Sequence, residues 1–249
     1  MTPQDAQAFE QLLANCADEP IRSPGAIQPH GVLLTLSEPE LRIQQISANV
    51  EALLGQPAAQ VLGQPLEQLL GDTDGQRIRE VLQLPRLSDA PPLHLAVNGA
   101  RFEGLLHRHQ GVLMLELEIQ LEHLQPQHLK EQTENLGRLL RRLQTAKTLN
   151  ELYTISVSEI QAMTGYDRVL IYRFEEEGHG QVIAEATRPT MEVFNGLFFP
   201  ASDIPQQARE LYRSNWLRII PNADYQPVPL LPALRPDTQQ ALDLSLIHI

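Results

Sequence analysis

The sequence predicts an α+β protein, and three features support that fold class. Short apolar runs bounded by turn residues, such as Val32–Leu36 and Arg168–Phe174, are typical of β-strands. Leucines at helical spacing near the middle of the chain indicate an amphipathic helix. The length of 249 residues, at about 150 residues per domain, fits one large domain or two small ones.

The first half of the chain is predicted to form one antiparallel sheet with small helices inserted. Prolines and glycines between Glu19 and Gly31 exclude a helix there. Apolar runs then predict strands over residues 32–36, 41–46, 93–97, 101–108 and 112–121. Between the second and third of these, short helices are expected over residues 47–55, 64–71 and 74–82, the first stopped by Gly55.

The second half begins with two predicted helices. The first carries an apolar stripe of Leu136, Leu139, Leu140 and Leu143. Its arginines, Arg138, Arg141 and Arg142, are expected on a solvated face. The second helix is expected over residues 149–163. A hairpin of strands over 168–174 and 181–186 follows, and a helix over 204–214 lies in a proline-rich stretch.

Charge and composition exclude several classes of partner. The chain has 19 Lys and Arg against 31 Asp and Glu, a net charge of −12. Nucleic acids and anionic lipids require a basic face, so neither is an expected partner. No apolar run approaches the roughly 20 residues of a membrane span, and the N-terminus does not resemble a secretory signal. We therefore expect a cytoplasmic protein with no membrane partner.

Few residues suggest chemistry by themselves. Cys16 is the one cysteine, so an intrachain disulfide and a cysteine-rich zinc site are excluded. His107 and His109 lie two apart on a predicted strand and face the same side. Without an evident third ligand, we interpret them as exposed polar positions rather than as a metal site. No phosphate-binding loop, paired-carboxylate motif or catalytic triad signature is evident.

Two clusters of residues are more specific than a generic α+β pattern. The first is Cys16–Ile21 with Pro24–Gly31, and the second is Gly196–Pro205 followed by Ala208–Arg209 and Leu211–Tyr212. Together they resemble the bacterial phytochromes, which are red/far-red photoreceptors that carry a bilin. Ser47–Asn49 with Leu53–Gly55 also resembles the PAS domain of that family, and Gly165–Phe174 resembles the opening of its GAF domain.

The resemblance implies a PAS domain and a GAF domain, each an antiparallel sheet with flanking helices, joined by connector helices. It places an N-terminal attachment segment at residues 1–22, the PAS domain at 23–124 and an incomplete GAF domain at 125–249. It also implies a figure-eight knot, with Ile27 at the crossing. Leu246–Ile249 depart from the family pattern. We interpret them as artefactual, so His248 is not taken for the family's pocket histidine.

The resemblance further implies a bound biliverdin IXα, joined to Cys16 by a thioether. Free cysteine, with a pKa of about 8.5, supplies some nucleophilic thiolate at neutral pH. Asp203 matches an aspartate whose backbone carbonyl faces the pyrrole N–H groups, and Arg218 matches an arginine that binds a propionate. The remaining implied pocket residues are the aromatic residues Tyr172, Phe194, Phe199 and Tyr212, with Ile204 and Pro205 against the ring face.

In the family, light isomerises the bilin, and the full-length homodimer passes the change to an output such as a histidine kinase. The fragment itself is expected to be a sensor rather than an enzyme. Two alternatives remain: a PAS–GAF scaffold that dimerises without pigment, and an enzyme with Cys16 as nucleophile. Each residue also has a plainer interpretation: Cys16 as an inert thiol, Asp203 as a helix cap and Arg218 as a surface arginine.

Overall fold

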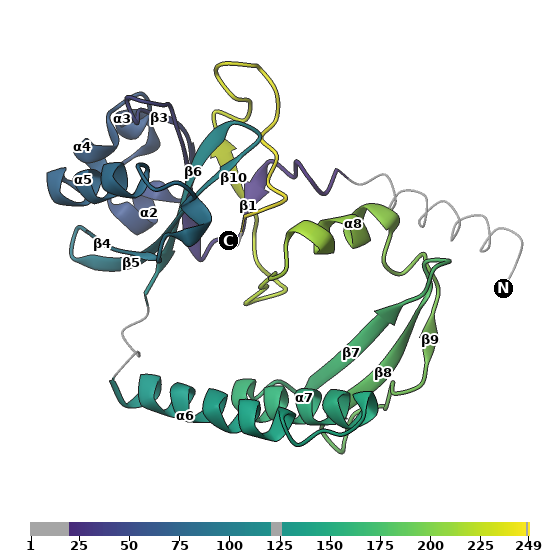
Figure 1. Ribbon diagram of the computed structural model, residues 1–249. Helices are drawn as coiled ribbons and strands as arrows, with labels where there is room; N and C mark the ends of the chain where they lie inside the picture. The colour runs from purple at the N-terminus through teal and green to yellow at the C-terminus, as the bar shows by residue number, and fades with distance from the viewer. Residues whose placement is uncertain (1–19, 121–125, 248) are drawn as a thin grey trace, which may run out of the picture. The chain divides into compact units, whose positions relative to one another are not determined.

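The computed structural model describes residues 20–120, 126–247 and 249. These residues form two compact units. The seven-stranded unit contains residues 20–120 and 211–249, and the three-stranded unit contains residues 126–210. Figure 1 labels the elements of both.

The seven-stranded unit is built on one antiparallel sheet. Its strand order is β1-β10-β3-β2-β6-β5-β4. The strands are β1 (Ala26–Ile27), β2 (Gly31–Leu36), β3 (Ile43–Ser47), β4 (Leu93–Val97), β5 (Ala100–His109), β6 (Val112–Ile119) and β10 (Val228–Leu231). Between β3 and β4 lie α2 (Val50–Leu54), α3 (Ala58–Val61), α4 (Leu66–Leu70), α5 (Asp72–Val81) and the 3-10 helix η1 (Leu87–Asp89). Figure 1 shows α2 to α5 grouped beside this sheet.

Alternate residues of β2 enter different cores, which explains its unbroken apolar run. Val32, Leu34 and Leu36 belong to the cluster that includes the helices. Leu33 belongs to a second cluster, with Met114 and residues of the C-terminal segment such as Leu230, Leu242 and Leu244. Because successive side chains of a strand point to opposite faces, β2 is buried on both sides. The sheet therefore has a core on each face.

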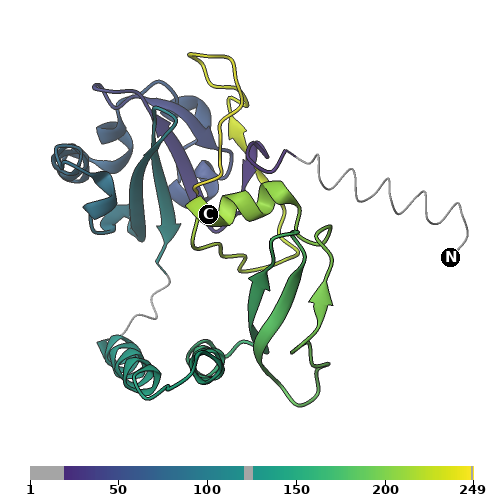
Figure 2. The same cartoon turned by 45° about the vertical axis from the view of Figure 1, so that its right-hand side comes forward.

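The sequence did not predict β10, which lies between β1 and β3. Figure 2 shows this strand, in yellow, beside β1 in purple. Residues near β1 also bond to several parts of the C-terminal segment: the Gly25 carbonyl accepts from Leu230 N at 3.1 Å, and Gln28 Nε2 donates to the Ile219 carbonyl at 2.8 Å. The knot expected from the family stays a prediction.

The three-stranded unit contains α6 (Pro126–Leu143), α7 (Leu149–Thr164) and a sheet of β7 (Arg168–Phe174), β8 (Gly180–Thr187) and β9 (Phe198–Phe199). The strand order is β7-β8-β9, with antiparallel neighbours, so the predicted hairpin is confirmed. Helix α8 (Gln206–Ser214) begins in this unit. No helix in the described ranges is both long enough and apolar enough to cross a membrane.

The arginine side of α6 differs from the prediction. Glu159 on α7 is almost fully buried and forms ion pairs with Arg142 and, at 3.6 Å, with Arg138. These two arginines therefore join α6 to α7 instead of forming only a solvated face. Conversely, Leu136 and Leu140 of the predicted apolar stripe are about half exposed, at 49% and 52%.

Candidate functional site

Three of the predicted pocket aromatics form one cluster in the three-stranded unit. The ring of Phe199 lies 6.2 Å from that of Tyr172 and 5.8 Å from that of Phe194, measured between centroids. Tyr172 pairs with Val182, and Phe199 pairs with Gly180, so β8 brings both rings to one face. A Cβ atom at Gly180 would lie 2.2 Å from the Tyr172 ring, so only glycine leaves room for it.

Two charged residues that the motifs did not identify hold Phe194 in place. Glu185, whose side chain is 1% exposed, accepts hydrogen bonds from the backbone nitrogens of Phe194, at 2.6 Å, and Asn195, at 2.8 Å. Its other oxygen forms an ion pair with Arg168 Nε at 2.9 Å. The Arg168 guanidinium also lies 3.8 Å above the centre of the Phe194 ring, a cation–π arrangement. These contacts fix the aromatic side of the candidate site.

The Pro200–Pro205 turn lies close enough to Tyr172 to affect its ionisation. Burial raises the pKa of the Tyr172 phenol, and the negative charge of Asp203 raises that pKa further, while the positive charge of Arg209 opposes the rise. Asp203 itself is exposed, and its backbone nitrogen donates to the Pro200 carbonyl at 3.1 Å. The structure therefore brings together the aromatic cluster and the turn that carries Asp203, Ile204 and Pro205.

Other predicted site residues are not part of this cluster. Cys16 lies outside the described residues. Ile27, on β1, is buried in the seven-stranded unit, and Tyr212 and Arg218 also belong to that unit. Tyr212 is 54% exposed. Arg218 is exposed and has no hydrogen-bond or ion-pair partner within the described part of the chain, so its guanidinium is available to an anionic ligand.

The residues present fit the bilin that the resemblance implies. Tyr172, Phe194 and Phe199 are only partly buried, so their rings offer an apolar surface to a flat conjugated ligand. In the same unit, the exposed turn at Asp203 supplies a polar backbone group.

The interpretation of the β5 histidines as exposed was wrong. His107 Nε2 lies 2.9 Å from the Glu116 carboxylate, which is almost fully buried, and His109 Nε2 lies 3.3 Å from Asp243 Oδ1. Each histidine therefore pairs with an acid and is largely shielded from solvent. In the described part of the chain, no group of three or more potential ligands could hold a metal ion.

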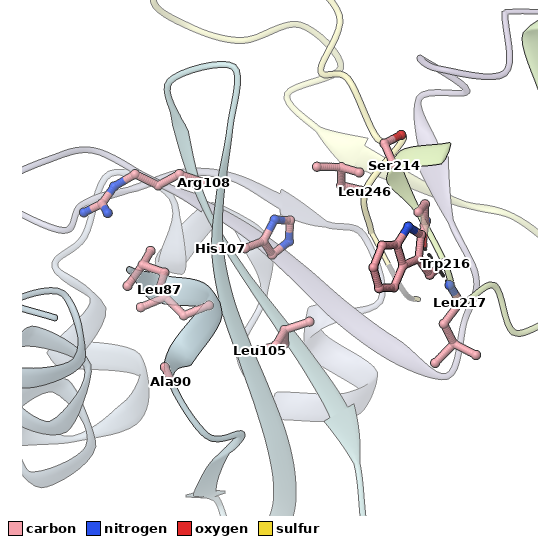
Figure 3. Close-up of a pocket in the computed structure, with 11 residues that line it drawn as sticks. Leu87, Ala90, Leu105, His107, Arg108, Ser214, Trp216, Leu217 and Leu246 are labelled. Atoms are coloured by element: carbon pink, nitrogen blue, oxygen red, sulfur yellow. Dashed lines mark hydrogen bonds between the residues drawn. The ribbon is translucent and has the colours of Figure 1, made fainter. Parts of the chain in front are cut away.

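A separate groove of about 590 Å³ lies in the seven-stranded unit. Figure 3 shows His107 and Leu105 of β5 on one side and Trp216 on the other. Trp216 is 92% exposed. None of the residues implied for bilin binding lines this groove. The residues that line it are Leu87, Ala90, Leu105, Leu106, His107, Arg108, Ser214, Asn215, Trp216, Leu217 and Leu246.

The chain resembles proteins of one family along nearly its whole length. A family model described as a PAS fold matches residues 16–120. Cyanobacterial phytochrome B of Nostoc sp. is 42% identical over 242 residues, which cover 95% of this chain and 32% of that protein. A bacteriophytochrome of Pseudomonas aeruginosa is 36% identical, over 94% of this chain and 31% of that protein. The chain thus spans about a third of the length of these curated relatives.

Solved structures match nearly the whole length of the chain. The wild-type chromophore-binding domain of a Stigmatella aurantiaca phytochrome has a TM-score of 0.85 and 46% identity, covering 94% of this chain and 78% of that one. The chromophore-binding domain of an unusual bacteriophytochrome from R. palustris has a TM-score of 0.83 and 39% identity, covering 94% of this chain and 76% of that one. The fold predicted from the sequence is therefore confirmed.

Proposed function

Because this chain belongs to the bacterial phytochrome family, we propose that it is the pigment-binding part of a red/far-red photoreceptor. The pigment is biliverdin IXα, which absorbs light and isomerises at its C/D methine bridge when bound. The observation that carries the proposal is the partly exposed aromatic cluster beside the Asp203 turn. A scaffold without pigment would have no need of that surface.

Each residue has a distinct part in the proposed site. The Cys16 thiol adds across the A-ring vinyl group to form a thioether, with no leaving group. Arg218 pairs with a propionate, and the Asp203 carbonyl accepts from the pyrrole N–H groups, which favours the protonated pigment. The aromatic rings, with Ile204, Pro205 and Tyr212, exclude water around the D ring. Residues 1–22 form the attachment segment, 23–124 the PAS domain and 125–249 the GAF part.

In the longer protein, we propose a cytoplasmic homodimer that passes the light signal to a C-terminal output such as a histidine kinase. The part represented by this chain senses light and catalyses no reaction. Its high acidic charge is consistent with a protein that binds neither nucleic acid nor membranes.

Intact mass after incubation with biliverdin IXα, measured under denaturing conditions, tests the tether. We expect the parent chain to gain the mass of one whole biliverdin, because addition to a vinyl group expels nothing. Cys16→Ser should gain none, while an Arg213→Met variant should react as the parent does. Absence of an adduct on the parent would contradict the proposal that this chain binds pigment covalently and would favour the scaffold.

A further inference from the structure

Arg209, on the first turn of α8, bonds to three backbone carbonyls of the three-stranded unit. Its Nη1 atom lies 3.3 Å from the carbonyl oxygen of Gly178 and 3.1 Å from that of Ala201, and it also donates to the carbonyl of Ile204. Hydrogen bonds from a charged donor are roughly twice as strong as neutral ones. The guanidinium therefore joins the β7–β8 turn to the carbonyls of Ala201 and Ile204, which lie before and after the Ser202–Asp203 segment.

The β7–β8 turn fits closely against this guanidinium. A Cβ atom at Gly178 would lie 2.9 Å from Arg209 Nη2 and 3.3 Å from the Ala201 Cβ. Gly178 also has a φ of +88°, which other residues rarely adopt. Two independent features thus require glycine where the turn meets Arg209. The turn and the guanidinium therefore approach each other closely, and moving either one weakens the hydrogen bond between Arg209 Nη1 and the Gly178 carbonyl.

The backbone of Arg209 is anchored as well. Its nitrogen donates to the Pro205 carbonyl at 3.1 Å, next to the nitrogen of Ala208, which donates to the same oxygen at 3.0 Å. The charge of Arg209 also lowers the pKa of Tyr172, against burial and Asp203, which both raise it. The guanidinium is therefore close enough to act on both the turn and the aromatic cluster.

We propose that Arg209 is the positioning residue of the Pro200–Pro205 turn and sets the direction in which Asp203 presents its carbonyl to the pigment. The inference rests on the proposed function, which assigns that carbonyl to the pyrrole N–H groups. The physical reason is local. Ala201 lies two residues before Asp203 and Ile204 lies one residue after it, so fixing the carbonyls of Ala201 and Ile204 restricts the peptide groups between them. Arg209 itself need not touch the pigment.

The first test needs no pigment, because the exchange rates of backbone amides in the Pro200–Pro205 turn and the β7–β8 turn show directly how well each turn is ordered. Asp203 N donates to the Pro200 carbonyl, and Gly178 N donates to the Glu175 carbonyl. Hydrogen–deuterium exchange by mass spectrometry should show both turns exchanging about tenfold faster in Arg209→Met, which keeps an unbranched side chain but has no donor. Arg209→Lys keeps the charge and three N–H donors, so part of the protection should return.

Arg213 supplies the matched control, because it lies on the same helix and is exposed. Arg213→Met should leave exchange at both turns unchanged. Equal exchange at the two turns in the parent, Arg209→Met and Arg209→Lys would overturn the inference. If Arg209→Met fails to fold, the Arg209→Lys chain decides the question. The inference then requires that the Asp203 amide of Arg209→Lys exchanges faster than in the parent but more slowly than an amide with no hydrogen bond.

The second test uses the same variants loaded with biliverdin IXα. Arg209→Met should still gain one biliverdin by mass, but its red absorption band should shift or broaden relative to the parent. The band of Arg209→Lys should lie closer to that of the parent in position and width, and the band of Arg213→Met should match that of the parent. An Arg209→Met band identical to that of the parent would overturn the link to the pigment. A parent chain that takes up no pigment contradicts the proposed function instead, and the exchange result then still decides whether Arg209 orders the turn.

Discussion

At the scale of single residues, Glu185 carries a charge that is almost removed from water. Its carboxylate depends on one ion pair, with Arg168, and on two backbone nitrogens in the loop that carries Phe194. A buried charge is tolerated only when such partners replace its hydration. The loop, the ring of Phe194 and the strand β8 are therefore joined through one side chain.

Replacing Glu185 by glutamine tests this arrangement. Glu185→Gln removes the charge and leaves the Arg168 guanidinium without its carboxylate. We expect a loss of about 2–3 kcal/mol in the free energy of unfolding, somewhat below the cost of deleting a buried partner outright. Urea unfolding followed by circular dichroism would measure it. Glu176→Gln, on the exposed β7–β8 turn, is the control and should change stability by less than about 0.5 kcal/mol. Equal effects of the two substitutions would contradict this role.

At this scale, the sequence predicted the site residues that lie in the motifs but not the charged residues that hold them in place. Tyr172, Phe199 and Asp203 were identified because the family resemblance points to them. Glu185 and Arg168 were not identified as partners, because a charged residue on a strand usually faces solvent. Their pairing depends on the register of β7 and β8, which places Arg168 opposite Thr187. No local pattern specifies that register.

At the scale of secondary-structure elements, β4 is an edge strand whose outward backbone groups are covered by α5. Asp74 Oδ2 accepts from Ala96 N at 3.2 Å, and Arg77 Nη1 lies 3.4 Å from the His94 carbonyl. The two side chains also pair with each other at 3.1 Å. Exposed edge strands invite pairing with another chain. These contacts occupy the hydrogen-bonding groups that such pairing would use.

The edge can be opened by one substitution. Asp74→Ala removes the acceptor for Ala96 N and the partner of Arg77. We expect the free energy of unfolding to fall by about 1–2 kcal/mol and the chain to associate more as its concentration rises. Light scattering over a concentration series would detect the association. Asp72→Ala, at an exposed position two residues earlier on α5, should leave scattering at the level of the parent. Identical scattering for both variants would show that Asp74 does not protect the edge.

Elements with a local signal were predicted well, and those without one were not. The runs that became β2 and β7, and the leucine spacing that became α6, are visible in the sequence itself. Strand β10 was missed because Pro229 lowers strand propensity. Its partners, on β1 and β3, lie about 180 to 200 residues earlier in the chain. Only the long-range hydrogen bonds identify it as a strand.

At the scale of the whole chain, segments far apart in the sequence are joined by polar contacts at the tip of the β5–β6 hairpin. Gln110 Nε2 donates to Asp243 Oδ2 at 2.7 Å, and Ser245 N donates to Asp243 Oδ1 at 2.9 Å. Burial alone would raise the pKa of Asp243. Hydrogen bonds from Ser245, together with those from His109, outweigh burial, so the pKa of Asp243 lies below its ordinary value.

This lowered pKa predicts a loss of stability in acid. A carboxyl whose pKa is lower in the folded state stabilises the fold fully at pH values above its unfolded pKa, which is about 3.9 for aspartate. That contribution is lost as the pH falls through the folded pKa. Asp243→Asn should therefore lower the urea midpoint at neutral pH and flatten its dependence on pH below about 4. Asp237→Asn is the comparison, because Asp237 pairs with Arg235 only two residues away and should have a smaller effect. Parallel acid profiles for the parent and Asp243→Asn would contradict the assignment.

The position of β10 also determines the order in which the chain can fold as it is made. The ribosome releases residues 20–120 first, yet their sheet lacks the strand between β1 and β3 until residue 231 has emerged. The residues of the three-stranded unit are synthesised in the interval. Until Leu230 has been synthesised, Ile27 and Leu33 therefore lack a residue that they pack with in the second core. A nascent chain halted shortly before residue 228 would expose that face to chaperones, whereas a released chain that includes β10 would not.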